Sequence, residues 1–241
     1  MTASARIALI IPTLNEEESI ASTLAEVPRP YVSQVIVADG GSTDRTVAFA
    51  AAGQAEVLAT GRGFGRACLE GARYAEDADI VVFMDGDGAD DPAHIPTLVQ
   101  PLVDGEADFV MASRTRGARE PGSMSWHQIA AGRMAGAGIH LLFGVRFSDM
   151  CTFRAIRRDR LLALGMREMT YGWNIEMQMR AARSGLRIRE IPVTYRCRRG
   201  GESKVAGNIG TSVKVGMRII ATFMRVASQS VSPVHEATDK R

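Results

Sequence analysis

One stretch decides the fold class of this chain: Ile80-Val81-Val82-Phe83-Met84-Asp85-Gly86-Asp87. Its first five residues are continuously apolar, which is typical of a short strand buried on both faces of a parallel sheet. Such a strand delivers Asp85 and Asp87 to the carboxyl edge of the sheet, where open α/β sheets bind ligands. Gly86 lets the backbone turn, so both carboxylates can converge on one hard cation. A solvated acidic turn is the alternative, because Asp and Gly are common in turns.

Other apolar runs alternate with helix-like stretches, which favours βαβ units. The strand candidates are residues 7–11, 35–38, 56–58, 80–84, 109–111 and 187–195. We therefore predict an α/β fold with a single Rossmann-like, mostly parallel sheet flanked by helices. Asn15 and the three glutamates after it predict the cap and first turn of an amphipathic helix through Ile20, Leu24 and Val27.

Composition limits the class of protein. The 241 residues are 46% hydrophobic, which is enough for one large domain with its own core. The formal net charge of +2 argues against general nucleic-acid binding. The three cysteines have no spacing typical of a disulfide framework or a zinc site. Residues 7–11 are too short an apolar run for the core of a signal peptide, so we expect a cytoplasmic protein.

A second carboxylate, Asp39, ends the strand predicted at residues 35–38 and precedes a glycine turn. Two acidic strand ends that face one crevice suit a nucleotide, with one acid near the base and the other at a metal. Asp44, which follows the same turn, is interpreted as a helix cap. The glycines at positions 61, 63 and 65 do not form a dinucleotide fingerprint, because that motif follows the first strand with a different spacing.

Six short motifs occur in a characteristic order: Ile11-Pro12-Thr13-Leu14-Asn15-Glu16, Asp39-Gly40-Gly41-Ser42, Gly63-Phe64-Gly65, Met84-Asp85-Gly86-Asp87, Ala112-Ser113-Arg114 and Gly201-Glu202-Ser203-Lys204. In this order they resemble family 2 glycosyltransferases, and most closely the dolichyl- and polyprenyl-phosphate sugar synthases. The resemblance extends over about residues 6–204. It implies a glycosyltransferase-A fold, a nucleotide-sugar donor, Mg²⁺ or Mn²⁺ at the Asp-x-Asp motif, and inversion at the anomeric carbon.

The resemblance also implies roles for individual residues. Asp85 and Asp87 are expected to serve the metal and the donor diphosphate. The nucleotide-binding residues expected from the same motifs are Pro12, Thr13, Asn15, Glu16, Asp39, Gly41, Gly63 and Asp85. Among these, the resemblance places Pro12, Glu16 and Asp39 around the base and ribose.

Two positions depart from the family pattern. Gly40 stands where a second aspartate is usual, and we expect the base contact to persist through Asp39. Ala89 stands where many members have a glutamine that helps the metal site. Metal binding is then expected to be weaker, or to depend on Asp90 or Asp91.

Transfer to a phosphate needs positive charge more than it needs a base. A phosphate monoester has a second pKa near 6 and is already an anionic nucleophile at neutral pH. The candidate cations are Arg114 and Arg133 for catalysis, and Arg199 and Lys204 for the nucleotide. A solvated surface cation is the alternative for each. Arg133 shares a predicted helix face with Trp126, Ala130 and Ala137, where a charge is costly without an anionic partner.

Two acids complete the predicted catalytic set of Asp87, Asp149, Glu176, Arg114 and Arg133. Glu176 lies in Thr170-Tyr171-Gly172-Trp173-Asn174-Ile175-Glu176, which resembles the helix-opening motif whose acid faces the reacting sugar in the family. An ordinary helix-surface pair with Arg180 is the alternative. Asp149 matches a position near the acceptor in relatives, or else it caps a turn.

The C-terminal region predicts an amphipathic helix at residues 206–227. Its apolar half comprises Ile209, Val213, Met217, Ile220, Phe223, Met224 and Ala227, and Lys214, Arg218 and Arg225 lie opposite. Three cations argue against a membrane span, whereas an apolar face backed by basic residues suits the lipid interface. Packing on the domain or a homodimer contact is the alternative. The expected division is a catalytic domain at 1–205, this helix, and a loose tail at 228–241.

The prediction is a metal-dependent inverting glycosyltransferase, peripheral on the cytoplasmic face of the membrane. It would transfer a hexose from GDP-mannose or UDP-glucose to a polyprenyl or dolichyl phosphate. One alternative keeps the fold but transfers the sugar to a soluble saccharide or a small phosphorylated acid. Another, motivated by Gly40 and Ala89, is a nucleotide-binding regulatory protein with a degenerate active site.

Overall fold

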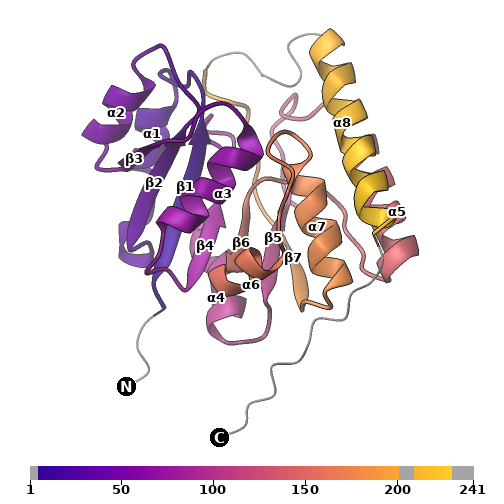
Figure 1. Ribbon diagram of the computed structural model, residues 1–241. Helices are drawn as coiled ribbons and strands as arrows, with labels where there is room; N and C mark the ends of the chain where they lie inside the picture. Colours follow the sequence, from indigo (N-terminus) through magenta and orange to yellow (C-terminus); the bar gives the residue numbers. More distant parts are fainter. Residues whose placement is uncertain (1–4, 201–208, 230–241) are drawn as a thin grey trace, which may run out of the picture.

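The computed structural model describes residues 5–200 and 209–229. A seven-stranded sheet in the order β3-β2-β1-β4-β6-β5-β7 forms its centre (Figure 1). The strands are β1 (Ile7–Thr13), β2 (Gln34–Asp39), β3 (Glu56–Ala59), β4 (Ile80–Phe83), β5 (Phe109–Ser113), β6 (Arg154–Arg157) and β7 (Ile188–Pro192). All pairings are parallel except those of β6 with β4 and β5. The predicted α/β fold with a mostly parallel sheet is confirmed.

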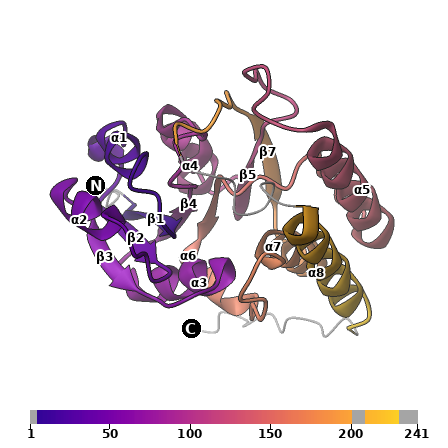
Figure 2. The ribbon, with the colours of Figure 1, turned by 90° about the horizontal axis from the view of Figure 1, so that it is seen from above.

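Helices cover both faces of the sheet (Figure 2). The helices are α1 (Ile20–Ala25), α2 (Thr46–Ala52), α3 (Phe64–Tyr74), α4 (Ile95–Val103), α5 (Trp126–Phe143), α6 (Arg158–Ala163), α7 (Trp173–Arg183) and α8 (Ile209–Ala227), with short 3-10 turns at Arg29–Tyr31 and Pro92–His94. Residues of α1 and α4 enter the core on one face of the sheet, and residues of α3 and α7 enter the core on the other. Helices α5 and α8 lie side by side beyond α7.

Strand β6 is the one strand that the apolar pattern does not predict. Its sequence is Arg-Ala-Ile-Arg, so no apolar run marks it. Arg154 is nevertheless fully buried, because its guanidinium donates to the carbonyls of Thr152 (3.2 Å) and Asn174 (3.3 Å). Since β6 is antiparallel to its neighbours, its first residue lies at the carboxyl edge of the parallel strands. The loop before β6 therefore joins the predicted site.

The predicted start of the first helix is wrong. Helix α1 begins at Ile20, and Asn15 lies before it with φ 53°. The Asn15 side chain accepts a hydrogen bond from the backbone N–H of Thr43 (2.9 Å), and the N–H of Asn15 donates to Ser42 Oγ (2.9 Å). Asn15 therefore joins the loop after β1 to the loop after β2 instead of capping a helix.

Glycines let α5 lie directly against its neighbours. A Cβ atom on Gly136 would stand 2.0 Å from the carbonyl oxygen of Phe147, and one on Gly132 would contact Asp149. On another side of the helix, a Cβ atom on Gly138 would meet the Phe223 ring of α8 at 2.7 Å. Helix α5 is thereby held close to both the loop that carries Asp149 and to α8.

Helix α8 leaves four residues of its predicted apolar half exposed, while Phe223 and Ala227 of the same half pack against the core. Val215, Thr222 and Val226 are buried, whereas Val213, Met217, Ile220 and Met224 are 54–64% exposed. Arg218 and Arg225 point inward and pair with Glu168. The two arginines predicted to back the apolar face are therefore paired with Glu168 in the folded chain. The boundary expected at 205/206 and most of the tail lie outside the described residues.

Candidate active site

Four strand ends meet at one edge of the sheet. Thr13 ends β1, Asp39 ends β2, and Asp85 follows β4. Arg114 follows β5, and the loop that leads into β6 arrives at the same edge. Because β1, β2 and β4 are parallel neighbours, their carboxyl ends meet. The sequence predicted this meeting point correctly, except for the contribution of the loop before β6.

Three carboxylates, those of Asp85, Asp87 and Asp90, crowd the loop after β4. Burial raises the pKa of Asp85 well above its usual range, and the nearby charges of Asp90 and Asp87 add to the effect. Burial also raises the pKa of Asp90 to about 7, again with a contribution from Asp87. The Asp90 carboxylate accepts a hydrogen bond from the N–H of Asp85 (3.1 Å). The loop thus concentrates negative charge that calls for a cation.

Arg198 supplies the cation that contacts this cluster, and the sequence did not single it out. Its Nη2 lies 2.8 Å from Asp87 Oδ2, and its buried Nη1 has no hydrogen-bond partner among the described residues. Two backbone hydrogen bonds hold the 195–199 segment over the loop, from Arg196 N–H to the Ala89 carbonyl (2.9 Å) and from Arg199 N–H to the Asp87 carbonyl (2.9 Å). Nothing in the run Arg-Cys-Arg-Arg marks which arginine faces the acids.

The guanidinium of Arg199, the predicted nucleotide-binding arginine, does not pair with the Asp87 carboxylate. Its guanidinium pairs with Glu26, and its aliphatic stem lies over Gly88. Asp91 is also occupied, since it accepts from Ala93 N–H and Thr194 Oγ1 and pairs with Arg196. Of the two acids expected to compensate for Ala89, Asp90 is therefore the one that lies with Asp85 and Asp87. Lys204 lies outside the described residues.

The donor set at this loop fits a divalent cation bound together with a diphosphate. Among the described residues, no three His, Cys, Asp or Glu side chains surround a common metal position. Mg²⁺ commonly takes only one or two protein carboxylates and completes its sphere with water and substrate phosphates. Asp85 and Asp87 provide such a pair, and their charge is only partly neutralised by Arg198.

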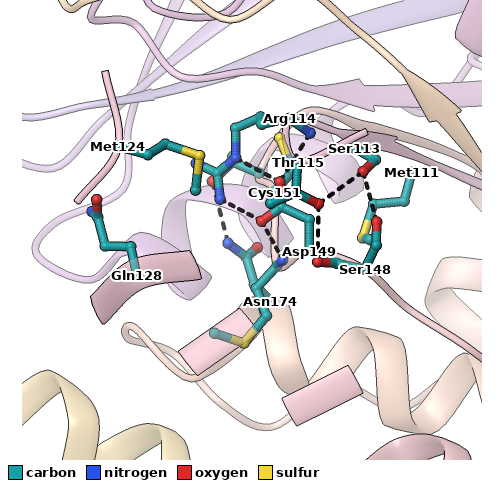
Figure 3. Close-up of polar contacts among 12 residues, drawn as sticks. Met111, Ser113, Arg114, Thr115, Met124, Gln128, Ser148, Asp149, Cys151 and Asn174 are labelled. Atoms are coloured by element: carbon teal, nitrogen blue, oxygen red, sulfur yellow. Dashed lines mark hydrogen bonds and ion pairs between the residues drawn. The ribbon is translucent and has the colours of Figure 1, made fainter. Parts of the chain in front are cut away.

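Asp149 and Arg114 form a buried ion pair at the centre of Figure 3. Asp149 Oδ1 lies 2.7 Å from Arg114 Nη2, and Asp149 Oδ2 accepts from Arg114 Nε (2.8 Å) and N–H (3.0 Å). Burial alone would raise the pKa of Asp149, but the hydrogen bonds and charge of Arg114 outweigh it and hold that pKa below its usual value. Arg114 also stacks over the Tyr195 ring at 5.0 Å. Arg114 is thus committed to Asp149 and Tyr195 and is not a free anion-binding cation.

Glu176 does not face the carboxylate cluster. It is fully buried and accepts from the N–H groups of Arg167 (2.9 Å) and Glu168 (2.6 Å) and from Arg180 Nε (2.9 Å). The Arg180 pair considered from the sequence is therefore present, together with two loop contacts that sequence spacing does not reveal. The geometry assigns Glu176 to packing between α7 and the 167–168 loop.

The helix-opening segment reaches the site through Asn174 instead. Its Nδ2 donates to Thr152 Oγ1 (3.2 Å), and the Thr152 hydroxyl lies near Asp85, where it lowers the pKa of that carboxyl against the larger effect of burial. Figure 3 shows Asn174 beside the Arg114–Asp149 pair. Arg133, in contrast, lies exposed on α5. Its helix face also exposes Trp126 (80%), so no buried anionic partner is required.

The expected nucleotide-binding residues line the ends of β1 and β2. Asp39 is buried, and its Oδ2 accepts from the N–H groups of Gly41 and Ser42 (both 2.9 Å). The hydroxyl of Thr13 donates to Asp39 Oδ1 (3.4 Å). Asp39 therefore shapes the glycine turn as well as facing the crevice, and replacing it with alanine is expected to disturb that turn.

The remaining members of this set lie close by. Pro12 pairs across the sheet with Ala38, and the N–H of Glu16 donates to Thr46 Oγ1 (2.8 Å). Asn15 and Glu16 line a small cavity of about 100 Å³ with Asp44. Gly63, with φ 134°, precedes α3 on the far side of β2. A larger hollow of about 460 Å³ lies at the opposite edge of the sheet, beside Arg6 and Asp79.

The raised pKa of Asp90 predicts an unusual pH dependence of stability. A carboxyl group whose pKa is higher in the folded protein than in the unfolded chain makes the folded state less stable as pH rises from about 4 to 7. In metal-free protein we expect Asp90→Asn to increase the free energy of unfolding at pH 8 by at most about 4 kcal/mol, and to have little effect at pH 4. Denaturant unfolding at both pH values measures this difference.

Asp91→Asn is the matched control for this test. Burial would raise the pKa of Asp91, but the Ala93 and Thr194 hydrogen bonds and the Arg196 charge outweigh it and lower that pKa. Asp91→Asn should therefore destabilise the protein at pH 8, and the loss should shrink as pH falls through the folded pKa. If Asp90→Asn lowers the free energy of unfolding at pH 8, as Asp91→Asn should, the pKa of Asp90 is not raised in the folded protein.

Comparison with known proteins identifies the family. Residues 8–164 match the model of glycosyl transferase family 2. The chain belongs to glycosyltransferase family 2. The undecaprenyl-phosphate mannosyltransferase of Micrococcus luteus is 35% identical over 223 residues, covering 85% of this chain and 89% of that protein. The dolichyl-phosphate hexose transferase of Haloferax volcanii is 34% identical over 204 residues, covering 83% and 86%.

Solved structures agree with this family. Glucosyl-3-phosphoglycerate synthase from Mycobacterium tuberculosis, in complex with Mn²⁺, UDP and glucosyl-3-phosphoglycerate, matches with a TM-score of 0.75 at 25% identity, covering 93% of this chain and 81% of that chain. The same synthase with Mg²⁺ and UDP also matches with a TM-score of 0.75. The predicted family, glycosyltransferase-A fold and enzyme class are confirmed.

Proposed function

We propose that this family 2 glycosyltransferase transfers a hexose from a nucleotide sugar, GDP-mannose or UDP-glucose, to a polyprenyl or dolichyl phosphate with inversion at the anomeric carbon. The observation that carries the donor half is the meeting of Asp39, Asp85 and Asp87 at one sheet edge. The observation that carries the acceptor half is the exposed apolar face of α8. Relatives named for undecaprenyl and dolichyl phosphate support the same acceptor class.

The donor occupies the β1–β2–β4 edge in this proposal. The base and ribose lie by Pro12, Glu16 and Asp39, and the diphosphate extends toward the loop after β4. Asp85 and Asp87 would hold Mg²⁺ or Mn²⁺, and a cation there would supply positive charge for the leaving nucleoside diphosphate. Arg198 neutralises Asp87 in the free enzyme, and its Nη1, which has no hydrogen-bond partner in the described part of the chain, is proposed to donate to a phosphate oxygen.

The acceptor phosphate needs orientation and charge neutralisation. Because it is already an anion at neutral pH, its oxygen attacks the anomeric carbon without a strong base. The Arg114–Asp149 pair fixes the loop before β6, on which Thr152 contacts Asp85. Arg133 lies exposed on α5 and is the cation proposed to meet the acceptor phosphate at the mouth of the site.

Helices α5 and α8 carry an apolar surface suited to lipid. The exposed side chains of this apolar surface are Trp126, Met134, Leu141 and Leu142 on α5 and Val213, Met217, Ile220 and Met224 on α8. Among the described residues, no helix is both long and apolar enough to cross a membrane. We propose that the apolar surface enters the cytoplasmic membrane interface, where a phosphate on a prenyl chain resides.

Disruption of the apolar surface tests the proposal that the acceptor is a lipid phosphate. Replacing Ile220 and Met224 with Asp should reduce binding to phosphatidylglycerol vesicles at least about tenfold, because about 25 cal/mol per Å² of apolar contact is lost and two charges enter the interface. Transfer to a long-chain polyprenyl phosphate in vesicles should fall with binding, and transfer to a short, water-soluble prenyl phosphate should persist. Phe223 is unsuitable for this test because it packs on Gly138.

Adding the same negative charges elsewhere on the molecule provides the control. Replacing Tyr74 and Val103 with Asp adds the same charge at exposed positions (48% and 47%) outside the apolar surface, and it should leave vesicle binding unchanged. Equal loss of transfer to both prenyl phosphates in the Ile220 and Met224 variant would show that α8 supports the catalytic domain and not the lipid contact.

A small phosphorylated acid is the second candidate acceptor. It is favoured by the match, at 25% identity, to a synthase solved with UDP and glucosyl-3-phosphoglycerate. A soluble acceptor leaves the exposure of Ile220 and Met224 without a role, so the lipid phosphate is the acceptor that we propose.

A further inference from the structure

Glu168 joins α8 to the loop around Gly63. Its carboxylate is buried, with 3% of the side chain exposed, although Glu168 belongs to no helix or strand. Three residues of α8 reach it from successive turns: Arg218 Nε (3.0 Å), Thr222 Oγ1 (3.1 Å) and Arg225 Nη2 (3.5 Å). Thr170 N–H also donates to it (3.0 Å). Glu168 is therefore the main anchor of the 168–170 segment on α8, and Glu176 shares Arg225 with it (3.4 Å).

The backbone of the same segment presses on the glycine loop. A Cβ atom added to Gly65 would lie 2.2 Å from the carbonyl oxygen of Glu168. A Cβ atom added to Gly63 would lie 2.5 Å from the carbonyl oxygen of Met169. The Met169 carbonyl also accepts from the N–H of Arg66 (3.0 Å). Only glycine allows this approach, so a displacement of residues 168–169 is transmitted to residues 63–66.

The glycine loop is continuous with the Asp39 turn. Residue 59 of β3 pairs with Asp39 of β2, and Thr60 N–H donates to the Asp39 carbonyl (2.9 Å). A Cβ atom on Gly40 would meet the Gly61 carbonyl oxygen at 3.7 Å. Residues 60–66 thus extend from the proposed base-binding turn to the segment held by Glu168.

We infer that Glu168 is a positioning residue for donor binding, which uses α8 to hold the 168–170 segment against the glycine loop. This inference rests on the proposed donor role of the β1–β2 edge and adds α8 to the support of that site. Glu168 touches neither Asp85 nor Asp87 in any contact that the structure records. Its effect should therefore fall on nucleotide affinity and not on the chemical step.

Glu168→Gln tests the inference, because it keeps the shape of the side chain and removes the charge that pairs with Arg218, while Arg225 keeps its second partner, Glu176. The dissociation constants of GDP and UDP with Mn²⁺ are measured by calorimetry at a temperature where every variant is fully folded by circular dichroism. For the nucleotide that wild type binds, we expect the dissociation constant to rise at least about fivefold. The KM for the nucleotide sugar should rise similarly, with kcat little changed.

Two further variants keep the test decisive. Arg218→Met removes the α8 side chain that lies nearest to Glu168. Because Arg218 is half-exposed, this variant should fold, and it should raise the dissociation constant even if Glu168→Gln fails to fold. Asp108→Asn breaks a comparable pair with Arg187 at the opposite edge of the sheet and should leave the dissociation constant unchanged. The inference is overturned if the folded Glu168 and Arg218 variants bind nucleotide as wild type does. Failure of wild type itself to bind either nucleotide would instead refute the donor role in the proposed function.

Discussion

Asp87→Asn should reduce hexose transfer on the order of 10³-fold or more, the largest effect of any single change considered for this enzyme. Asp87 is one of the two carboxylates that we propose hold a divalent cation together with the donor diphosphate, and an amide cannot supply its charge. The same variant should lose the Mn²⁺-dependent part of nucleotide stabilisation. Initial rates at saturating acceptor, and melting temperatures with and without metal and nucleotide, measure both effects.

Asp91→Asn provides the control for this first prediction. It removes one charge from the same loop, but Asp91 pairs with Arg196 and Thr194 and not with the Asp85 cluster. Its transfer rate should stay within a few-fold of wild type. An Asp87→Asn enzyme that keeps a tenth of its activity, and keeps it in the presence of a chelator, would show that Asp87 holds no essential metal.

Asp149→Ala should have the largest effect on stability. The change leaves the Arg114 guanidinium buried, with 17% of its side chain exposed. It also removes the carboxylate that accepts two hydrogen bonds from that guanidinium. Removing one partner of a buried pair typically costs about 3–5 kcal/mol, because the other charge stays uncompensated. Denaturant unfolding should show this loss, and transfer should fall because the loop carrying Thr152 is no longer fixed.

The pair Asp108–Arg187 offers a comparison for this second prediction. It has similar distances, but the Arg187 side chain is 58% exposed and stays hydrated when its partner is removed. Asp108→Asn should therefore cost about 1 kcal/mol or less. The double variant Arg114→Leu with Asp149→Leu should regain part of the stability lost in Asp149→Ala. Equal losses in Asp149→Ala and Asp108→Asn would mean that the Arg114 charge reaches water.

The parallel part of the fold was predictable because apolar runs mark it. Six of the strands follow from such runs, and the acidic residues at their ends follow from strand polarity. Strand β6 was not predictable, because Arg154 is buried by carbonyl contacts that only the tertiary structure provides. The antiparallel direction of β6, which brings Thr152 to Asp85, was missed for the same reason.

The sequence predicted where the residues of the candidate site lie better than it predicted which side chains they contact. The sequence placed Asp39, Asp85 and Asp87 at one edge, and the resemblance added Asp149. It did not distinguish Arg198 from Arg199, since neighbouring residues on an extended segment point to opposite sides. It also favoured Glu176 over Asn174, because the motif marks the helix opening but not which side chain of the first turn faces the crevice.

Product partition tests the central claim most directly. The full-length enzyme is incubated with GDP-mannose or UDP-glucose labelled in the sugar, with Mn²⁺, and with either polyprenyl phosphate in phosphatidylglycerol vesicles or 3-phosphoglycerate in solution. The account predicts that label from one nucleotide sugar enters the organic phase only with the lipid acceptor, stops with chelator, and has inverted anomeric configuration. Label that stays in water and appears only with phosphoglycerate would contradict it.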